Sequence, residues 1–244
     1  MKLRIKDYPL VLELLVNQRN GIEEFLEGGS KNILINRARS LKSTIKRGRT
    51  WRFSIPIDHP LMFIKNNSQL QVDISCEIEG RGDIITKQNI ILRLWSFDKN
   101  LCYREEIDST ELKVKLDHNN CKRVMLRFHF DFKEPNGKQL EPKYHFHVGG
   151  RCRTDDENCW LPEQIDIPRF PCPPMDLILI CEFLLINFFP KESEQLRKKP
   201  EWQSLVRKSQ DLFLKPYYDI CTKKYLKDQN ETLLGNLVAP LKGV

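Results

Sequence analysis

Three of the five histidines in this chain fall in two short segments, 127–131 (RFHFD) and 144–150 (YHFHVGG), in which polar and apolar residues alternate. Successive side chains of a β-strand point to opposite faces, so alternate residues of each segment share a face. If the two segments pair as a hairpin, their polar residues form one patch above an aromatic face. The residues of this patch are Arg127, His129, Asp131, His145 and His147.

The chemistry available to this patch is that of a divalent metal. Imidazole and carboxylate groups are ligands that zinc, manganese and non-haem iron accept. Cross-strand neighbours lie roughly 4.5 to 5.5 Å apart at Cβ, which allows His129, Asp131, His145 and His147 to converge. An ion held by three of them keeps an open position for water, whose pKa then falls toward about 7. One interpretation of the patch is therefore a site for a divalent metal, Zn or Mn, with Arg127 stabilising a phosphoryl or acyl oxyanion.

Three other interpretations of the patch stay open. Without a metal, one histidine can act as general base and another as general acid, as acid-base cleavage of RNA requires. Alternatively, Cys152 and Cys159 can complete a structural zinc site with His145 and His147. The simplest alternative is a solvated sheet face, because any half-buried strand alternates polar with apolar residues.

A second group of residues suits phosphate binding. The segment 31–52 contains eight Lys or Arg residues and no Asp or Glu, whereas the whole chain has a net charge of +7, so the remainder sums to −1. Such a segment can contact the phosphates of a nucleic acid, and Trp51 can stack on a base. The alternative is a solvated helix face, or one complementary to an acidic protein. The basic residues are Lys31, Arg37, Arg39, Lys42, Lys46, Arg47, Arg49 and Arg52.

Composition and motifs limit the classes of protein to consider. A chain of 244 residues with 40% hydrophobic residues can bury a substantial core. The first residues lack the apolar stretch of a signal peptide, which predicts a cytoplasmic protein with reduced cysteines. The apolar run 175–189 is shorter than the roughly 20 residues of a membrane span and contains acidic residues, so we expect a buried helix and no membrane contact. The sequence has no nucleotide-binding glycine loop, serine-esterase elbow or His-Glu-x-x-His motif.

The elements that must position these residues follow from periodicity. Residues 7–26 show helical spacing, with Gly28 and Gly29 as the expected stop, and a second helix is expected through the basic segment. A proline-rich connection is expected over 151–174, followed by a helix over 175–189 and one opened by Pro200, with Pro216 separating it from a last helix. Alternation predicts strands over 70–78, 90–97, 101–107, 112–116, 124–132 and 144–148.

These elements predict an α+β fold, with N-terminal helices, a central antiparallel sheet or open barrel, and a C-terminal helical layer on the aromatic face. We expect a basic helical arm over residues 1–50, a sheet over 51–150, and a proline-rich loop with helices over 151–244. The last two regions are expected to form one globular unit.

Two functions are compatible with the sequence. Because no strong catalytic motif is present, we favour a cytoplasmic binding or regulatory subunit of a larger assembly, whose basic arm contacts nucleic acid or an acidic protein partner. The alternative is a hydrolase, a nuclease or phosphodiesterase, that uses the His/Asp patch as metal ligands or as an acid-base pair. The sequence leaves open whether the protein is an enzyme.

Overall fold

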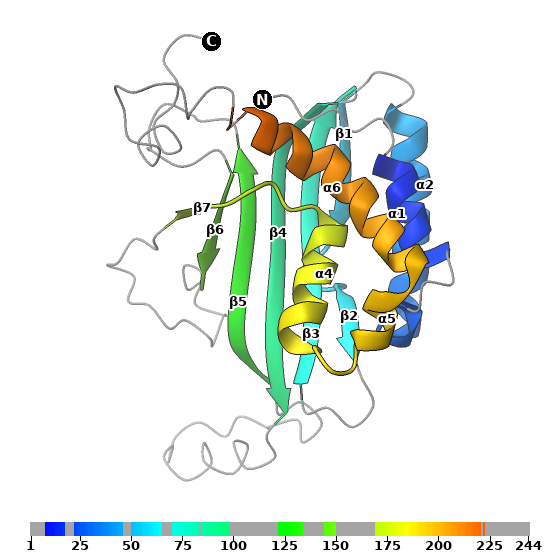
Figure 1. The fold of residues 1–244 in the computed structure, drawn as a ribbon, viewed down its shortest axis with the longest axis vertical. Helices are drawn as coiled ribbons and strands as arrows, with labels where there is room; N and C mark the ends of the chain where they lie inside the picture. Colours follow the sequence, from blue (N-terminus) through cyan, green and yellow to red (C-terminus); the bar gives the residue numbers. More distant parts are fainter. Residues whose placement is uncertain are drawn as a thin grey trace, which may run out of the picture.

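The computed structural model describes residues 8–17, 22–45, 50–64, 70–82, 84–97, 122–133, 144–149, 169–220 and 222. They form a seven-stranded antiparallel sheet with helices on one face (Figure 1). The sheet is open, with β1 and β7 at the two ends of its strand order. The predicted α+β class is confirmed.

The strands follow the alternation of the sequence. Those expected over 70–78, 90–97, 124–132 and 144–148 correspond to β3, β4, β5 and β6, whereas those expected over 101–107 and 112–116 lie outside the described residues. The strand order is β1-β3-β4-β5-β6-β7, and β2 also pairs with β3. The bounds are β1 (Thr50–Ile55), β2 (Leu61–Ile64), β3 (Leu70–Arg81), β4 (Ile84–Phe97), β5 (Lys122–Lys133), β6 (Tyr144–Val148) and β7 (Phe170–Pro171).

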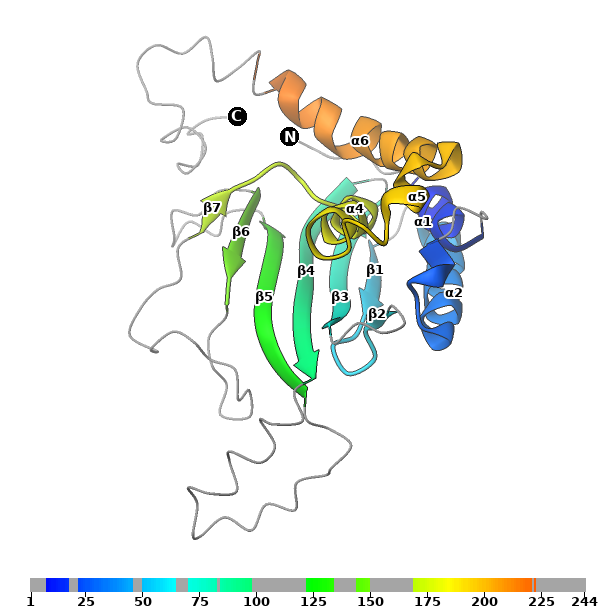
Figure 2. The same ribbon diagram turned by 60° about the horizontal axis from the view of Figure 1, so that its bottom comes forward.

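The helices bury one face of the sheet. In Figure 2, α4 lies between the sheet and α6, which explains why its sequence is apolar nearly all round. None of the helices in the described part of the chain is long and apolar enough to span a membrane. The helices are α1 (Tyr8–Asn17), the 3₁₀ turn η1 (Ile22–Glu24), α2 (Gly28–Ile45), α4 (Leu177–Phe188), α5 (Glu194–Lys198) and α6 (Pro200–Ile220).

The N-terminal helix differs from the prediction. The helix expected over 7–26 ends at Asn17, and Gly28 opens α2 instead of stopping the preceding helix. Glycine is tolerated in a first turn, where the backbone N–H groups have no partner within the helix. The hydroxyl of Ser30 accepts a hydrogen bond from the backbone N–H of Met62 at 3.0 Å, so contacts with β2 fix where α2 begins.

Pro216 was also expected to separate two helices, and this prediction is wrong. It lies inside α6, four residues before the helix ends at Ile220. A proline so near the end removes a single backbone donor from the last turns. Tyr217 packs edge-on against Tyr144, with ring centroids 5.9 Å apart, and this contact holds the end of α6 against the sheet.

Trp51 has a structural role, which corrects the prediction that it stacks on a base. It is buried opposite Gly80 in the β1–β3 pairing, and its Nε1–H donates to the Gly82 carbonyl at 2.7 Å. A Cβ atom at position 80 would overlap the Trp51 ring and the Ile84 carbonyl, so the ring occupies space that only glycine leaves open.

Asp176 caps the first turn of α4 from a fully buried position. One of its carboxylate oxygens accepts from the Leu179 N–H at 3.0 Å and from the Ser209 hydroxyl of α6 at 2.5 Å. The buried Tyr8 hydroxyl accepts from the neighbouring Leu177 N–H at 3.4 Å. Burial raises the pKa of Asp176 to about 6, although these hydrogen bonds to the carboxylate lower it.

The free energy of unfolding should therefore fall as the pH rises from about 4 to about 7. The pKa of Asp176 in the fold, about 6, lies above its usual value of 3.8, so its contribution is complete below the usual value and is lost as the pH passes 6. Two pKa units correspond to about 3 kcal/mol. Asp176→Asn keeps an oxygen for the cap and should flatten this part of the pH profile in urea unfolding. The exposed control Asp211→Asn should keep the profile, and the same slope in both variants would refute the assignment.

Candidate active site

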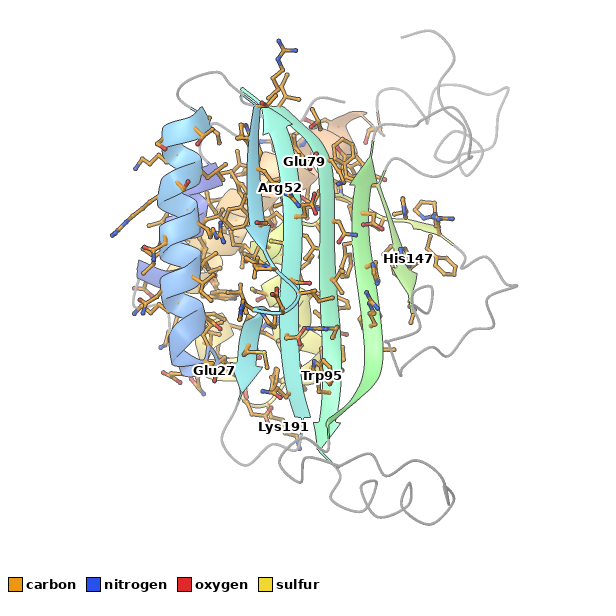
Figure 3. All side chains as sticks on the ribbon, turned by 180° about the vertical axis from the view of Figure 1, so that it is seen from behind. Glu27, Arg52, Glu79, Trp95, His147 and Lys191 are labelled. Carbon is orange, nitrogen blue, oxygen red and sulfur yellow. The ribbon has the colours of Figure 1, made fainter. Side chains whose placement is uncertain are left out.

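The pairing of β5 with β6 gathers the polar patch. Asp131 lies opposite His145, and His129 lies opposite His147, as the alternation of the two segments predicts. The intervening Phe130 packs against α4 on the other face of the sheet. The polar side chains therefore point away from the helices, and Figure 3 shows the molecule from their side.

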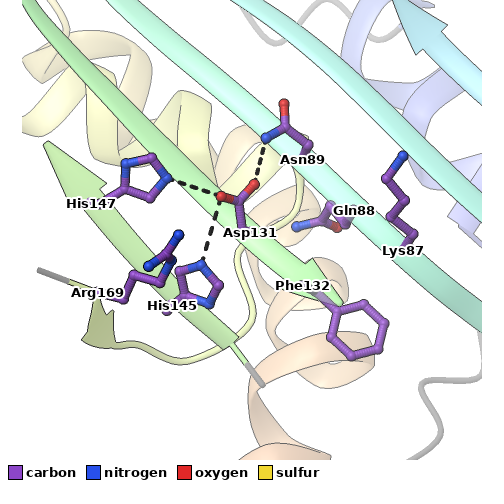
Figure 4. Close-up of a pocket in the computed structure, with 8 residues that line it drawn as sticks. All are labelled: Lys87, Gln88, Asn89, Asp131, Phe132, His145, His147 and Arg169. Atoms are coloured by element: carbon purple, nitrogen blue, oxygen red, sulfur yellow. Dashed lines mark hydrogen bonds and ion pairs between the residues drawn. The ribbon is translucent and has the colours of Figure 1, made fainter. Parts of the chain in front are cut away.

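Asp131 is the centre of this cluster (Figure 4). One carboxylate oxygen, Oδ2, lies 3.1 Å from Nε2 of His147 and 3.7 Å from Nε2 of His145. The other, Oδ1, accepts a hydrogen bond from the amide of Asn89 on β4 at 2.5 Å. The side chains of Asp131 and His145 are 19% and 4% exposed, so the carboxylate and imidazoles interact in surroundings that contain little water.

The protonation states of the cluster suit metal binding. Burial by itself raises the pKa of Asp131, but the hydrogen bond from His147, the charge interaction with His129 and the hydrogen bond from Asn89 hold it below its usual value. Burial lowers the pKa of His129 to about 3, with contributions from His147 and Arg127. At neutral pH the site thus offers a charged carboxylate and a neutral imidazole, the forms that coordinate a metal.

Three side chains are close enough to share an ion. One ligand atom each from His129, Asp131 and His147 lie within 4.8 Å of one another. Nε2 of His129 and Nδ1 of His147 are buried and make no hydrogen bond. Because buried polar atoms usually have partners, these nitrogens indicate a place for a ligand. Two imidazoles and one carboxylate suit Zn, Mn or Fe and leave further coordination positions open.

The orientation of the rings sets a condition on coordination. His129 and His147 stack with ring centroids 4.5 Å apart and planes inclined by 17°. A nitrogen lone pair lies in the plane of its ring, so two parallel rings do not point at a common ion. Coordination of one ion by both rings would therefore require one of them to turn out of the stack.

A cavity of about 280 Å³ adjoins the cluster. Of its two cationic side chains, Lys87 forms ion pairs with Glu77 and Glu79, so Arg169 is the cation that favours an anion beside the carboxylate and imidazoles. The volume is slightly below the roughly 300 to 1,000 Å³ of most ligand pockets, which suits one anionic group and the atoms next to it. The lining residues, drawn in Figure 4, are Lys87, Gln88, Asn89, Asp131, Phe132, His145, His147 and Arg169.

The cations of the cavity differ from the one predicted. Arg127 shares a strand with His129 and lowers its pKa, but it does not line the cavity. Lys87 comes from β4, and Arg169 comes from the segment that leads into β7. Sequence analysis missed both residues, as well as Asn89, because their positions depend on which strands pair with β5 and β6.

The basic residues fall into three groups. Those on α2 are exposed, while its apolar residues Leu34, Ala38 and Leu41 are buried against the rest of the fold. Arg52 on β1 forms an ion pair with Glu77, at 3.0 Å. The exposed residues of α2 are Lys31, Arg37, Arg39 and Lys42, and the predicted contacts that lie outside the described residues are Lys46, Arg47 and Arg49.

The alternative zinc site also lies beyond the described ranges, because neither Cys152 nor Cys159 is among them. Three described cysteines, Cys76, Cys172 and Cys181, are free thiols.

Comparisons of the chain with models of known protein families, with curated proteins and with solved structures give no match.

Proposed function

We propose that this protein is a divalent-metal-dependent hydrolase of phosphoesters, with the metal held by His129, Asp131 and His147. The observation that carries the proposal is the approach of three ligand atoms to within 4.8 Å beside a buried ring nitrogen that has no partner. This geometry favours the hydrolase over the binding subunit, because a solvated polar face does not need buried, unpaired imidazole nitrogens.

Several residues in and beside the cavity have roles in this reaction. When bound by His129, Asp131 and His147, a divalent ion would supply Lewis-acid chemistry that lowers the pKa of a water toward about 7. Arg169 would stabilise the negative charge that grows on the phosphoryl group while the water oxygen bonds to phosphorus and loses its proton to solvent. The ester bond from phosphorus to the leaving oxygen breaks, and His145, which lines the cavity, gives that oxygen a proton.

The proposal is tested by turnover of bis(p-nitrophenyl) phosphate by the full-length protein. We expect hydrolysis with Mn²⁺ or Zn²⁺, loss of activity after chelation, and recovery when the metal is restored. His145→Ala should lower kcat by about 10² to 10⁴-fold, the usual contribution of a general acid, in protein that thermal melting shows to be folded. His59→Ala is the matched control, because His59 is exposed on the β1–β2 loop.

Two outcomes would contradict the proposal. Turnover that survives complete chelation would favour acid-base catalysis by His147, which Asp131 orients through the 3.1 Å hydrogen bond. No turnover with any divalent metal, in protein shown to be folded, would leave the cluster without the proposed role.

The exposed basic residues of α2 favour a second candidate function, the binding of a polyanionic partner within a larger assembly. The helix carries four cations and no acidic residue, and a nucleic acid or an acidic protein would complement it. Titration of the full-length protein with an oligonucleotide and with poly-glutamate distinguishes these partners. Binding of neither at moderate salt would oppose this function.

A further inference from the structure

The helix that carries the exposed cations, α2, and the cavity lie at opposite ends of the polar face of the sheet. The helix packs beside β1 and β2, whereas the cavity lies over β4, β5 and β6. Figure 3 shows α2 and the polar face of the sheet from the same side, with β1, β3 and β4 between α2 and the strands of the cluster. The described ranges place no helix over this polar face.

The distance across this surface exceeds the size of a small ester. Four strand spacings separate β1 from β6 in the sheet order, which corresponds to roughly 19 Å at about 4.8 Å each. A single nucleotide in the cavity cannot also contact α2. Only an extended chain with repeated negative charges can occupy both ends at once.

The middle of the surface is electrically balanced. Glu77 accepts ion pairs from Arg52 at 3.0 Å and from Lys87 at 3.1 Å, and Lys87 also lies 3.8 Å from Glu79. Two cations and two carboxylates therefore neutralise one another between the basic ends. A polyanion can cross this region without meeting unpaired negative charge from these residues.

We infer that the substrate of the proposed site is a single-stranded nucleic acid, which α2 anchors by its phosphates while one phosphodiester enters the cavity. This inference rests on the proposed function for the cleavage step. A single strand fits better than a duplex, because His145 in the cavity wall is only 3% exposed and a flexible strand can bend a phosphate into such a recess. An acidic protein would complement α2 equally well but offers the cavity no phosphodiester.

The test compares two triple variants that remove the same charge from two helices. Arg37→Ala/Arg39→Ala/Lys42→Ala alters α2, and Arg207→Ala/Lys208→Ala/Lys215→Ala alters the exposed surface of α6. Binding of a fluorescent single strand of about 12 nucleotides is measured by polarisation between about 50 and 200 mM salt. Cleavage of this strand and of a dinucleotide is then measured with added Mn²⁺.

The α2 variant should bind the long strand at least about tenfold more weakly, and its slope of log affinity against log salt should be shallower by about 2, near 0.7 for each lost phosphate contact. Its loss of kcat/KM should be larger on the long strand than on the dinucleotide. The α6 variant should behave as the unmodified protein.

Equal binding losses in the two variants, or tighter binding of poly-glutamate than of the single strand, would overturn the inference. So would equal kcat/KM for the long strand and the dinucleotide. Failure of the proposed function looks different, because neither substrate nor bis(p-nitrophenyl) phosphate would then be cleaved, while the binding and salt measurements would still test the role of α2.

Discussion

Replacing Asp131 with asparagine should lower kcat/KM for a phosphodiester by at least about 10³-fold, or about 4 kcal/mol of transition-state stabilisation. Asparagine has nearly the shape of aspartate, so its oxygen can still accept from Asn89 and its amide can donate to His147 once that imidazole changes tautomer. The fold should therefore be kept. The variant lacks the negative charge that would bind a metal and that orients the imidazoles of His145 and His147.

The matched control for this prediction is Asp58→Asn, because Asp58 is an exposed carboxylate on the loop between β1 and β2. Steady-state kinetics at saturating metal should show normal kcat/KM for the control. Thermal melting should place both variants close to the unmodified protein. If Asp131→Asn retains activity within about tenfold, the carboxylate is not a ligand.

Replacing Arg93 with methionine should destabilise the fold by about 3 to 5 kcal/mol. Asp73 lies opposite Arg93 on the polar face, and its side chain is only 3% exposed. Arg93 makes two hydrogen bonds to its carboxylate, at 2.8 and 2.9 Å, and Trp95 adds a third at 2.6 Å. Arg93 also donates to the Ile57 carbonyl, so its loss removes both a contact with the β1–β2 loop and the cation that forms an ion pair with the buried Asp73 carboxylate.

Urea unfolding of a double-mutant cycle checks this prediction. Asp73→Asn/Arg93→Met should be more stable than Arg93→Met alone, because the buried negative charge is removed together with Arg93. Lys198→Met breaks an exposed pair with Glu194 on α5 and should leave the unfolding free energy unchanged within error. Similar effects of Arg93→Met and Lys198→Met would show that the buried pair contributes little.

Local patterns predicted the cluster well because its geometry follows from the period of a strand. The alternation of Phe128, His129, Phe130 and Asp131 decides which side chains face α4 and which face away, whatever the rest of the sheet does. Once the faces are set, the positions of the polar side chains relative to one another depend only on the register in which β5 pairs with β6. The aromatic residues on these two strands restrict that register.

The rest of the cavity was not predictable, because it depends on pairings between segments distant in sequence. Asn89 meets Asp131 only through the β4–β5 register, and Arg169 arrives because β7 pairs with β6. Tertiary contacts also override local rules at Gly28, where β2 positions the start of α2. The same holds at Trp51, whose ring fills the space above Gly80.

The central claim is that His129, Asp131 and His147 form one metal site, and metal content tests it most directly. Full-length protein is stripped with chelator, reloaded with Mn²⁺ or Zn²⁺, and its bound metal is counted by mass spectrometry. The account predicts one tightly bound ion per chain, lost in both His129→Ala and His147→Ala and kept in His59→Ala. An ion count unchanged by either of the first two substitutions, or no bound ion in the unmodified protein, would contradict it.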